Sequence, residues 1–211
     1  MKATITSLIF LLLSLTVSSQ TYKYIGIEEG LSNQKIYKIQ KDARGYMWFL
    51  THVGIDQYNG KEIKHYKLRE GNRELDPLLN INWTFLDKTG TLLVTGKQGR
   101  IFRYDSGHDR FVQIYNMYNY WNKDYHAFVR YSYIDQEDNV WLCGKSAIHL
   151  FNIESGQKQQ ISNRLGNITC IEQINSEHFF IGTDKRIYLA KLENGNLKEL
   201  SCGKLGMMDM H

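Results

Sequence analysis

Proline, cysteine and net charge are all scarce in this sequence. The 211 residues include 1 Pro and 3 Cys, against 17 Gly and 14 Tyr. Lys and Arg outnumber Asp and Glu by only 26 to 22, and the basic residues are scattered, so the composition carries no nucleic-acid footprint. A hydrophobic fraction of 42% excludes an intrinsically disordered chain. Aromatic residues and glycines with so little proline favour strands joined by tight turns, and we expect an all-β protein.

The three cysteines exclude two kinds of site. They are Cys143, Cys170 and Cys202, and an odd number cannot form a closed disulfide framework. Their spacing also fits no zinc motif. Cys143 and Cys170 lie within apolar stretches, so we predict that both thiols are buried and act as small hydrophobic groups.

Motifs for catalysis and for metal binding are absent as well. No Gly-x-Gly occurs, and the one histidine followed by an acidic residue, His108, lies in a turn-like stretch. A histidine kinase needs a phospho-accepting histidine on a helix and a glycine-rich lid over ATP. These 211 residues therefore cannot by themselves be the phosphotransferase. No pair of histidines has metal-ligand spacing. We assign no catalytic residue, no metal site and no cofactor to these residues.

The first 19 residues have the parts of a secretory signal peptide. A short positive region with Lys2 precedes an apolar run at residues 5–17, and small residues lead to Ser19. The apolar run is shorter than the roughly 20 residues that span a membrane. We therefore expect cleavage after Ser19 and a periplasmic location, with an uncleaved anchor helix as the alternative.

One segment of the sequence recurs four times. Each copy has a large apolar anchor shortly after a turn, and the anchors are spaced 45, 48 and 39 residues apart. They are Trp48, Leu93, Trp141 and Phe180. A period of about 40–50 residues is typical of four-stranded β-propeller blades. Around each anchor, apolar runs and turn signals alternate in the order expected for four antiparallel strands.

Aspartates hold one fixed place in the repeat. Asp42, Asp87 and Asp135 each open the first turn, where a carboxylate can accept backbone N–H groups just ahead while Gly45 or Gly90 allows a positive φ. Because these aspartates obey the repeat, we predict that they are structural and not a catalytic pair. The residues expected to build the repeat are Asp42, Gly45, Trp48, Gly54, Tyr58, Asp87, Gly90, Gly99, Asp135 and Trp141.

Three motifs of the first copy carry a family resemblance. They are Glu29-Gly-Leu-Ser-Asn33, Asp42-x-x-Gly-x-Met-Trp-Phe49 and Gly54-Ile-x-x-Tyr-Asn-Gly60. Together they resemble the two-component-regulator propeller repeat, and the later copies extend the resemblance to about residue 201. That repeat builds the exported sensor region of hybrid two-component systems in Bacteroides-type bacteria, which respond to breakdown products of polysaccharides.

The resemblance and the repeats together predict an incomplete β-propeller at residues 20–201. We expect about four blades of four antiparallel strands, at residues 27–66, 79–115, 128–162 and 165–201. Residues 22–27 resemble the fourth strand of a blade whose first three strands are missing upstream, as in rings that an N-terminal strand closes. We therefore expect residues 202–211 to be a tail at a truncation point. A closed four-bladed ring is the alternative.

An aromatic insertion at residues 115–126 is the strongest departure from the repeat. Aromatic planes beside Asn, Asp and Lys suit a sugar, because a pyranose offers C–H faces for stacking and hydroxyls for hydrogen bonds. The alternative is a loop that packs its own aromatic residues. A charged insertion at residues 69–76 should emerge on the same face. The predicted ligand-binding residues are Tyr118, Tyr120, Trp121, Asp124 and Tyr125.

The resemblance implies a function and a set of partners. The segment would sense an oligosaccharide outside the cytoplasm and control transcription through domains beyond this chain, among them a histidine kinase. The resemblance also implies a homodimer of the full-length protein, an inner-membrane anchor through a downstream helix, and no nucleic-acid contact by this segment. Two alternatives stay open. One is a stand-alone secreted propeller that binds glycan or protein without signalling; the other is a propeller lyase or hydrolase, for which no repeat-breaking cluster of acidic, His or Tyr residues is visible.

Overall fold

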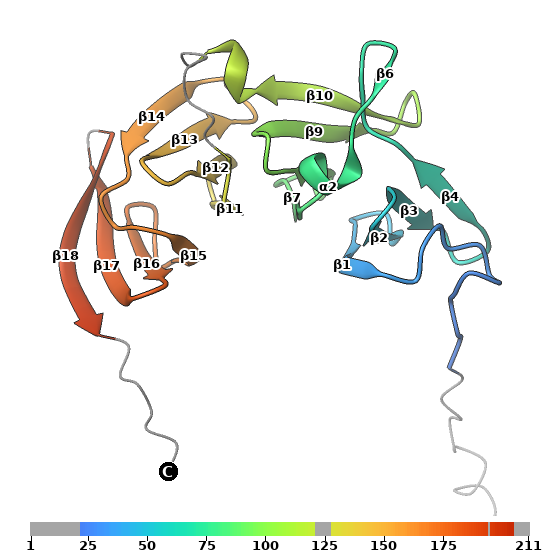
Figure 1. Ribbon diagram of the computed structural model, residues 1–211, viewed down its shortest axis with the longest axis horizontal. Coiled ribbons are helices and arrows are strands. Elements are labelled where there is room, and N and C mark those ends of the chain that lie inside the picture. The colour runs from blue at the N-terminus through green and yellow to red at the C-terminus, as the bar shows by residue number, and fades with distance from the viewer. Residues whose placement is uncertain (1–21, 121–127, 194, 205–211) are drawn as a thin grey trace, which may run out of the picture.

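The computed structural model describes residues 22–120, 128–193 and 195–204, which fold almost entirely as β-strands. Four four-stranded antiparallel sheets follow one another along the chain, and we number them blades 1 to 4 (Figure 1). Strands that are consecutive within a blade are neighbours in its sheet, as short turns between alternating apolar runs require. The predicted signal peptide at residues 1–19 lies outside the described residues.

Each repeat copy forms one blade. Blade 1 contains β1 (Ile36–Lys41), β2 (Met47–Thr51), β3 (Ile55–Tyr58) and β4 (Ile63–Tyr66). Blade 2 contains β7 (Trp83–Leu86), β8 (Leu92–Thr95), β9 (Arg100–Asp105) and β10 (Arg110–Asn116). Blade 3 contains β11 (Tyr131–Ile134), β12 (Asn139–Cys143), β13 (Ala147–Asn152) and β14 (Lys158–Ser162). Blade 4 contains β15 (Ile168–Gln173), β16 (His178–Thr183), β17 (Arg186–Glu193) and β18 (Asn196–Lys204).

The blades follow an arc (Figure 1). The first strand of each blade lies on the inner side of the arc and the fourth strand lies on the outer side. The arc does not close into a ring within the described residues. The expected fold class, an all-β propeller of four-stranded blades without a closed ring, is confirmed.

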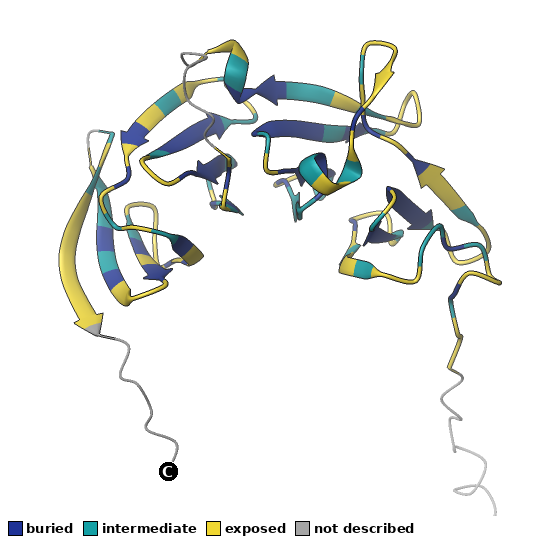
Figure 2. Cartoon of the chain, in the orientation of Figure 1, coloured by how far each residue is buried: buried dark blue, intermediate teal, exposed yellow. Residues whose placement is uncertain are grey.

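An apolar cluster fills each of the three interfaces between blades, and its buried strands are dark blue in Figure 2. Successive side chains of a strand point to opposite faces, so a blade inside the arc contributes to two clusters. In blade 3, Trp141 packs with residues of blade 4, whereas the adjacent Val140 packs with residues of blade 2. This explains why the central strands are apolar on both faces instead of alternating with polar residues.

The segment ahead of blade 1 differs from its expected structure. Residues 22–35 contain no strand, so the prediction of a fourth strand at residues 22–27 is wrong. A turn forms instead, in which the Leu31 N–H donates to the Gly26 carbonyl at 2.9 Å and the Leu31 side chain is buried. Ser32 then hydrogen bonds to Asp56 of β3 through both its N–H and its hydroxyl. No sheet pairing among the described residues holds this segment on blade 1. The contacts of Ser32 and Leu31 do so, together with one backbone hydrogen bond from the His52 N–H to the Lys35 carbonyl at 3.2 Å.

One of the two cysteine predictions is also wrong. Cys143 is buried, but Cys170 is exposed. Cys170 of β15 lies beside Gly182 of β16, where its Sγ is so close that a Cβ on Gly182 would meet it at 2.4 Å. This face of blade 4 has no neighbouring blade among the described residues. Burial of an apolar strand therefore depends here on the next blade as well as on the sequence of the strand.

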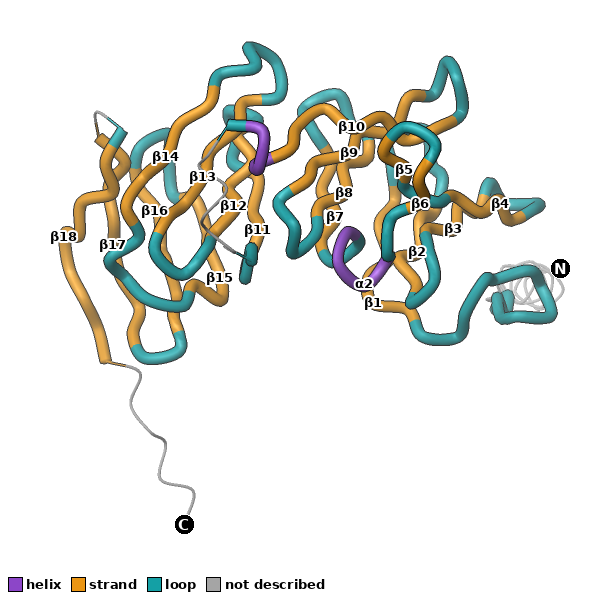
Figure 3. The backbone as a smooth tube through the Cα atoms, turned by 45° about the horizontal axis from the view of Figure 1, so that its top comes forward, coloured by secondary structure: helices purple, strands orange, loops and turns teal. Residues whose placement is uncertain are grey.

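Two connections between blades contain short helices (Figure 3). The charged insertion forms a hairpin of β5 (Arg69–Glu70) and β6 (Arg73–Glu74), followed by α2 (Pro77–Asn80). The aromatic insertion begins with the 3₁₀ helix η2 (Met117–Asn119). No helix in the described part of the chain has the length and apolar character needed to cross a membrane.

Candidate ligand-binding site

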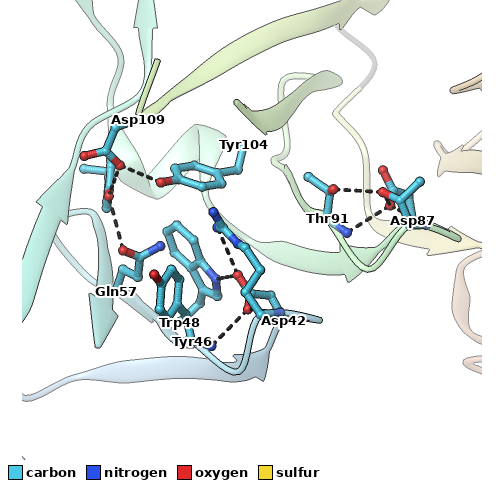
Figure 4. Close-up of polar contacts among 11 residues, drawn as sticks. Asp42, Tyr46, Trp48, Gln57, Asp87, Thr91, Tyr104 and Asp109 are labelled. Carbon is cyan, nitrogen blue, oxygen red and sulfur yellow. Dashed lines mark hydrogen bonds and ion pairs between the residues drawn. The ribbon is translucent and has the colours of Figure 1, made fainter. Parts of the chain in front are cut away.

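The aspartate of the first turn in blade 1 uses both carboxylate oxygens within its own blade (Figure 4). Asp42 Oδ1 accepts the N–H groups of Arg44 and Tyr46 at 3.0 and 2.9 Å. Its Oδ2 accepts the indole Nε1–H of Trp48 at 3.0 Å. The carboxylate thus fixes the turn and the buried anchor together.

Blades 2 and 3 repeat this arrangement with one substitution. Asp135 Oδ2 accepts the indole Nε1–H of Trp141 at 2.9 Å, while its Oδ1 holds the turn. In blade 2 the anchor is Leu93, which has no donor, and Arg103 Nε instead donates to Asp87 Oδ2 at 2.8 Å. Burial acts to raise the pKa of Asp87, but hydrogen bonds from Thr89, Thr91 and Arg103 lower it overall.

The same turns also join neighbouring blades. The Ala43 N–H donates to the Gly90 carbonyl at 3.2 Å, and Gly90 has a φ of +74°. A Cβ on Gly90 would lie 2.3 Å from that of Ala43, so only glycine fits. Blade 3 has Asp138 at this place, with a φ of +60°, and its carboxylate accepts the Lys88 N–H at 3.0 Å. Burial raises the pKa of Asp138 and the Lys88 contact partly offsets this.

The remaining repeat residues also occupy turns and strand ends. Gly54 sits where a Cβ would lie 2.9 Å from the Tyr66 carbonyl oxygen. Gly99 has a φ of +66°, and a Cβ there would lie 2.9 Å from that of Met117. The Tyr58 hydroxyl donates to the Gly60 carbonyl at 2.5 Å. Gly45 has a φ of +87°.

A polar network that the sequence did not reveal joins blade 1 to blade 2. Asp109 accepts the hydroxyls of Tyr104 and Tyr66 at 2.5 and 2.6 Å, and Lys64 Nζ lies 3.1 Å from its second oxygen (Figure 4 shows Tyr104 and Asp109). These contacts, with Tyr104 first, lower the pKa of Asp109 to about 2, while burial raises the pKa of Tyr66. The repeat gives no sign of this role. Tyr58 pairs with Ile63 as Tyr104 pairs with Phe111, so Asp109, two residues before Phe111, corresponds to Lys61 in blade 1.

The structure describes two of the five predicted sugar-binding residues, and these two differ in exposure. Trp121, Asp124 and Tyr125 lie outside the described residues. Tyr118 is half-buried against the cluster between blades 2 and 3, whereas Tyr120 is 53% exposed. Tyr120 is therefore the described member of the set that offers surface to a ligand.

Tyr120 is held in a stack of aromatic rings. Its ring is parallel to that of the buried Tyr115, with centroids 5.6 Å apart, and Tyr115 in turn stacks on Phe151 of blade 3 at 4.7 Å. Lys158 of β14 places its ammonium 4.3 Å from the centroid of the Tyr120 ring. Sequence reasoning missed Lys158, because it reaches Tyr120 only when blades 2 and 3 pack together. An aromatic ring with a cation beside it at the outer rim of two blades is a place where a polar ring compound could stack.

Two other titratable groups lie in the core of blade 3. His149 is buried, and burial lowers its pKa to about 4. Burial likewise raises the pKa of the Cys143 thiol. No group of His, Cys, Asp and Glu side chains suited to a metal ion occurs in the residues that the structure describes.

Comparisons with known proteins place these observations in a family context. Residues 30–52 match the sequence family described as "Two component regulator propeller". Among solved structures, the extracellular domain of the putative hybrid two component system BT3049 from B. thetaiotaomicron superposes with a TM-score of 0.63 at 17% identity, over 85% of this chain and 26% of that one. The corresponding domain of BT4673 gives 0.57 at 18% identity, over 84% and 22%.

A protein with a different description has a related fold. PorZ, a surface component of the type-IX secretion system of Porphyromonas gingivalis, gives a TM-score of 0.54 at 9% identity, over 79% of this chain and 21% of that one. No curated protein matches the sequence significantly. The chain spans about a quarter of the length of the hybrid two-component structures. The chain is thus an array of β-propeller blades, and its residues 30–52 match the two-component-regulator propeller family.

Proposed function

We propose that this chain is the ligand-sensing propeller segment of a hybrid two-component signal-transduction protein. It lies outside the cytoplasm, responds to oligosaccharides, and acts on transcription through a kinase and further domains beyond this chain. The observation that carries the proposal is the match of residues 30–52 to the two-component-regulator propeller family. The propeller fold shared with extracellular domains of putative hybrid two-component systems supports it.

The oligosaccharide site is proposed at the rim between blades 2 and 3. The residues proposed are Tyr118, Tyr120, Trp121, Asp124 and Tyr125, with Lys158 added from the structure. Tyr120 supports this choice because it is 53% exposed yet fixed by its parallel contact with Tyr115. A fixed ring loses little conformational entropy when a sugar stacks on it.

Binding to a panel of oligosaccharides tests the site. Isothermal titration with the whole chain should identify a ligand whose affinity falls about threefold to tenfold in Tyr120→Ala, as expected for one lost aromatic contact. Tyr24→Ala is the matched control, because Tyr24 is 75% exposed but lies on the segment ahead of blade 1. Equal losses in the two variants would place the ligand elsewhere.

The signalling part of the proposal has its own test. The native gene downstream of codon 211 should continue through further repeats to a membrane helix and a histidine kinase. A stop codon at that place, with a cooperatively folded product, would favour a secreted propeller that binds without signalling. Sedimentation of the full-length protein tests the homodimer that the resemblance implies.

A further inference from the structure

A groove separates the outer strands of blades 1 and 2. It has a volume of about 580 Å³ and is lined by β4, by the β5–β6 hairpin and by β10. Figure 1 shows this hairpin rising between β4 and β10. The volume lies in the roughly 300–1,000 Å³ range of ligand sites. The groove is distinct from the rim of Tyr120, which lies between blades 2 and 3.

Two arginines give the groove its charge. Arg69 of β5 and Arg110 of β10 line it, both are exposed, and neither forms an ion pair with any carboxylate in the described part of the chain. The acidic side chain of the groove, Asp109, is already engaged by Lys64 and two tyrosines. Lys67 is paired with Glu74 at 2.8 Å. The charge left without a partner in the groove is therefore positive.

The groove also offers hydrogen-bonding groups to a strand. Among the described strands, β10 is the outermost of blade 2 and pairs only with β9, so its other edge carries backbone N–H and C=O groups that no described strand pairs with. Gln113 of β10 lines the groove, and its buried Oε1 has no hydrogen-bond donor among the described residues. Exposed strand edges pair readily with an added strand.

We propose that this groove binds an extended, acidic segment of a partner protein. The segment adds along the edge of β10, its carboxylates pair with Arg69 and Arg110, and one of its backbone N–H groups donates to Gln113 Oε1. Alternate residues of a strand point to the same side, so acidic residues at every second position would face the arginines. Val112, two residues from Arg110 and 36% exposed, lies on the same side of β10 as Arg110 and offers apolar contact beside it.

The aromatic residues of the groove favour a peptide over an acidic sugar. Tyr66 is buried, and Phe111 lies against Tyr66, Tyr104 and Trp48 with ring centroids 5.4–5.7 Å apart. Their rings are thus occupied by one another and do not present the open plane on which a pyranose stacks. The groove instead presents positive charge and an unpaired strand edge, and an extended acidic peptide can bind to both.

The test uses a fluorescein-labelled heptapeptide of alternating Glu and Val and measures its anisotropy with the whole chain. Binding should weaken about tenfold or more in the double variant Arg69→Gln/Arg110→Gln, and also when NaCl is raised from about 50 to about 500 mM. The control Lys145→Gln/Lys185→Gln makes the same charge change at exposed lysines outside the groove and should shift affinity less than about twofold.

Two further probes make the outcome decisive. A peptide N-methylated at alternate residues keeps its charge but loses backbone donors, so it should bind at least about fivefold more weakly if a strand is added. Full retention of binding by that peptide, or equal losses in both double variants, would overturn the proposal. Binding of trigalacturonate in place of the peptide, lost in Arg69→Gln/Arg110→Gln, would also overturn it and assign the groove to acidic glycans.

Discussion

The two end blades present their outward faces in opposite ways. On blade 1 the outward row contains Phe49 and Asp56, which are paired across β2 and β3 and are 6% and 0% exposed. The segment at residues 22–35 holds to this face through Ser32 and the buried Leu31. On blade 4 the outward row contains Phe180, which is 49% exposed, and Ile187, which is 45% exposed.

This difference shows that burial in the array is a property of interfaces between blades. Phe180 holds the repeat position of Trp48, yet Trp48 is 0% exposed because it packs on blade 2. In repeat proteins each unit gains stability from its neighbours, and terminal units need a cap or a polar face. Blade 1 has such a cap in the described structure, whereas the outward face of blade 4 has none among the described residues.

The largest expected effect contrasts the two anchors directly. Trp48→Ala removes a fully buried ring that contacts Tyr66, Tyr104 and Phe111, and it leaves Asp42 without its indole donor. We expect a loss of about 3–5 kcal/mol in the free energy of unfolding. Phe180→Ala should cost less than about 1 kcal/mol, because half of its ring is already in water.

Urea unfolding followed by tryptophan fluorescence and circular dichroism measures both anchor variants. An equally large loss in Phe180→Ala would mean that the outward face of blade 4 is covered in solution, and the contrast between the end blades would then disappear.

The cap on blade 1 is expected to have the next largest effect. Asp56 accepts the N–H and the hydroxyl of Ser32 and lies 2.8 Å from His65 Nδ1. Asp56→Ala should cost about 2–3 kcal/mol, because hydrogen bonds to a charged group are lost and the Ser32 N–H is left without its acceptor. Asp184→Ala, at an exposed carboxylate of blade 4, is the control and should cost less than about 0.5 kcal/mol.

Limited proteolysis locates the loss in the Asp56 variant. New cleavage within residues 22–35, before the blades unfold, would show that the segment is held by Asp56. Unchanged protection of this segment in Asp56→Ala would contradict its role as a cap.

A smaller effect is expected from acid at the contact between blades 1 and 2. The pKa of Asp109 is about 2, below the ordinary value of 3.8. Since the folded state favours the ionised carboxylate, its contribution to stability is present above about pH 4 and is lost as the pH falls through about 2. The urea midpoint of Asp109→Asn should therefore fall less than that of the wild type over this range.

Glu193→Gln in blade 4 is the control variant, and its urea midpoint is measured over the same pH range. Glu193 is exposed and its pKa is lowered by Lys191 alongside it, so solvent should screen the pair and leave the acid profile near that of the wild type. A profile of Asp109→Asn that coincides with the wild type would show that the tyrosine contacts do not stabilise the interface between the first two blades.

Much of the fold could be predicted because its signals are local. The apolar runs, the turn aspartates and the anchor spacing repeat within each blade, and the strands formed where these signals lie. A turn such as that of Asp42 is built from residues no more than six positions apart. Local chemistry of this kind is visible in a single sequence.

The features that were missed depend on contacts between distant residues. Asp109 meets Tyr66 across 43 positions, and Ser32 meets Asp56 across 24. Lys158 reaches Tyr120 only across an interface between blades. An apolar stretch predicted a buried Cys170, but its burial requires a blade packed beside it. Periodicity gives the strands of a blade and does not say which of its faces has a neighbour.

The cysteines allow the contrast between the end blades to be measured without perturbing the fold. Cys170 and Cys202 are exposed and should react with iodoacetamide in the folded protein, whereas Cys143 should not, because it is buried and its pKa is raised. Cys202→Ser leaves Cys170 as the reporter of the outward face of blade 4. Mass spectrometry should find Cys170 modified at about the rate of the unfolded chain. Protection of Cys170, with Cys202 still reactive in the wild type, would show that another blade or a second copy covers this face.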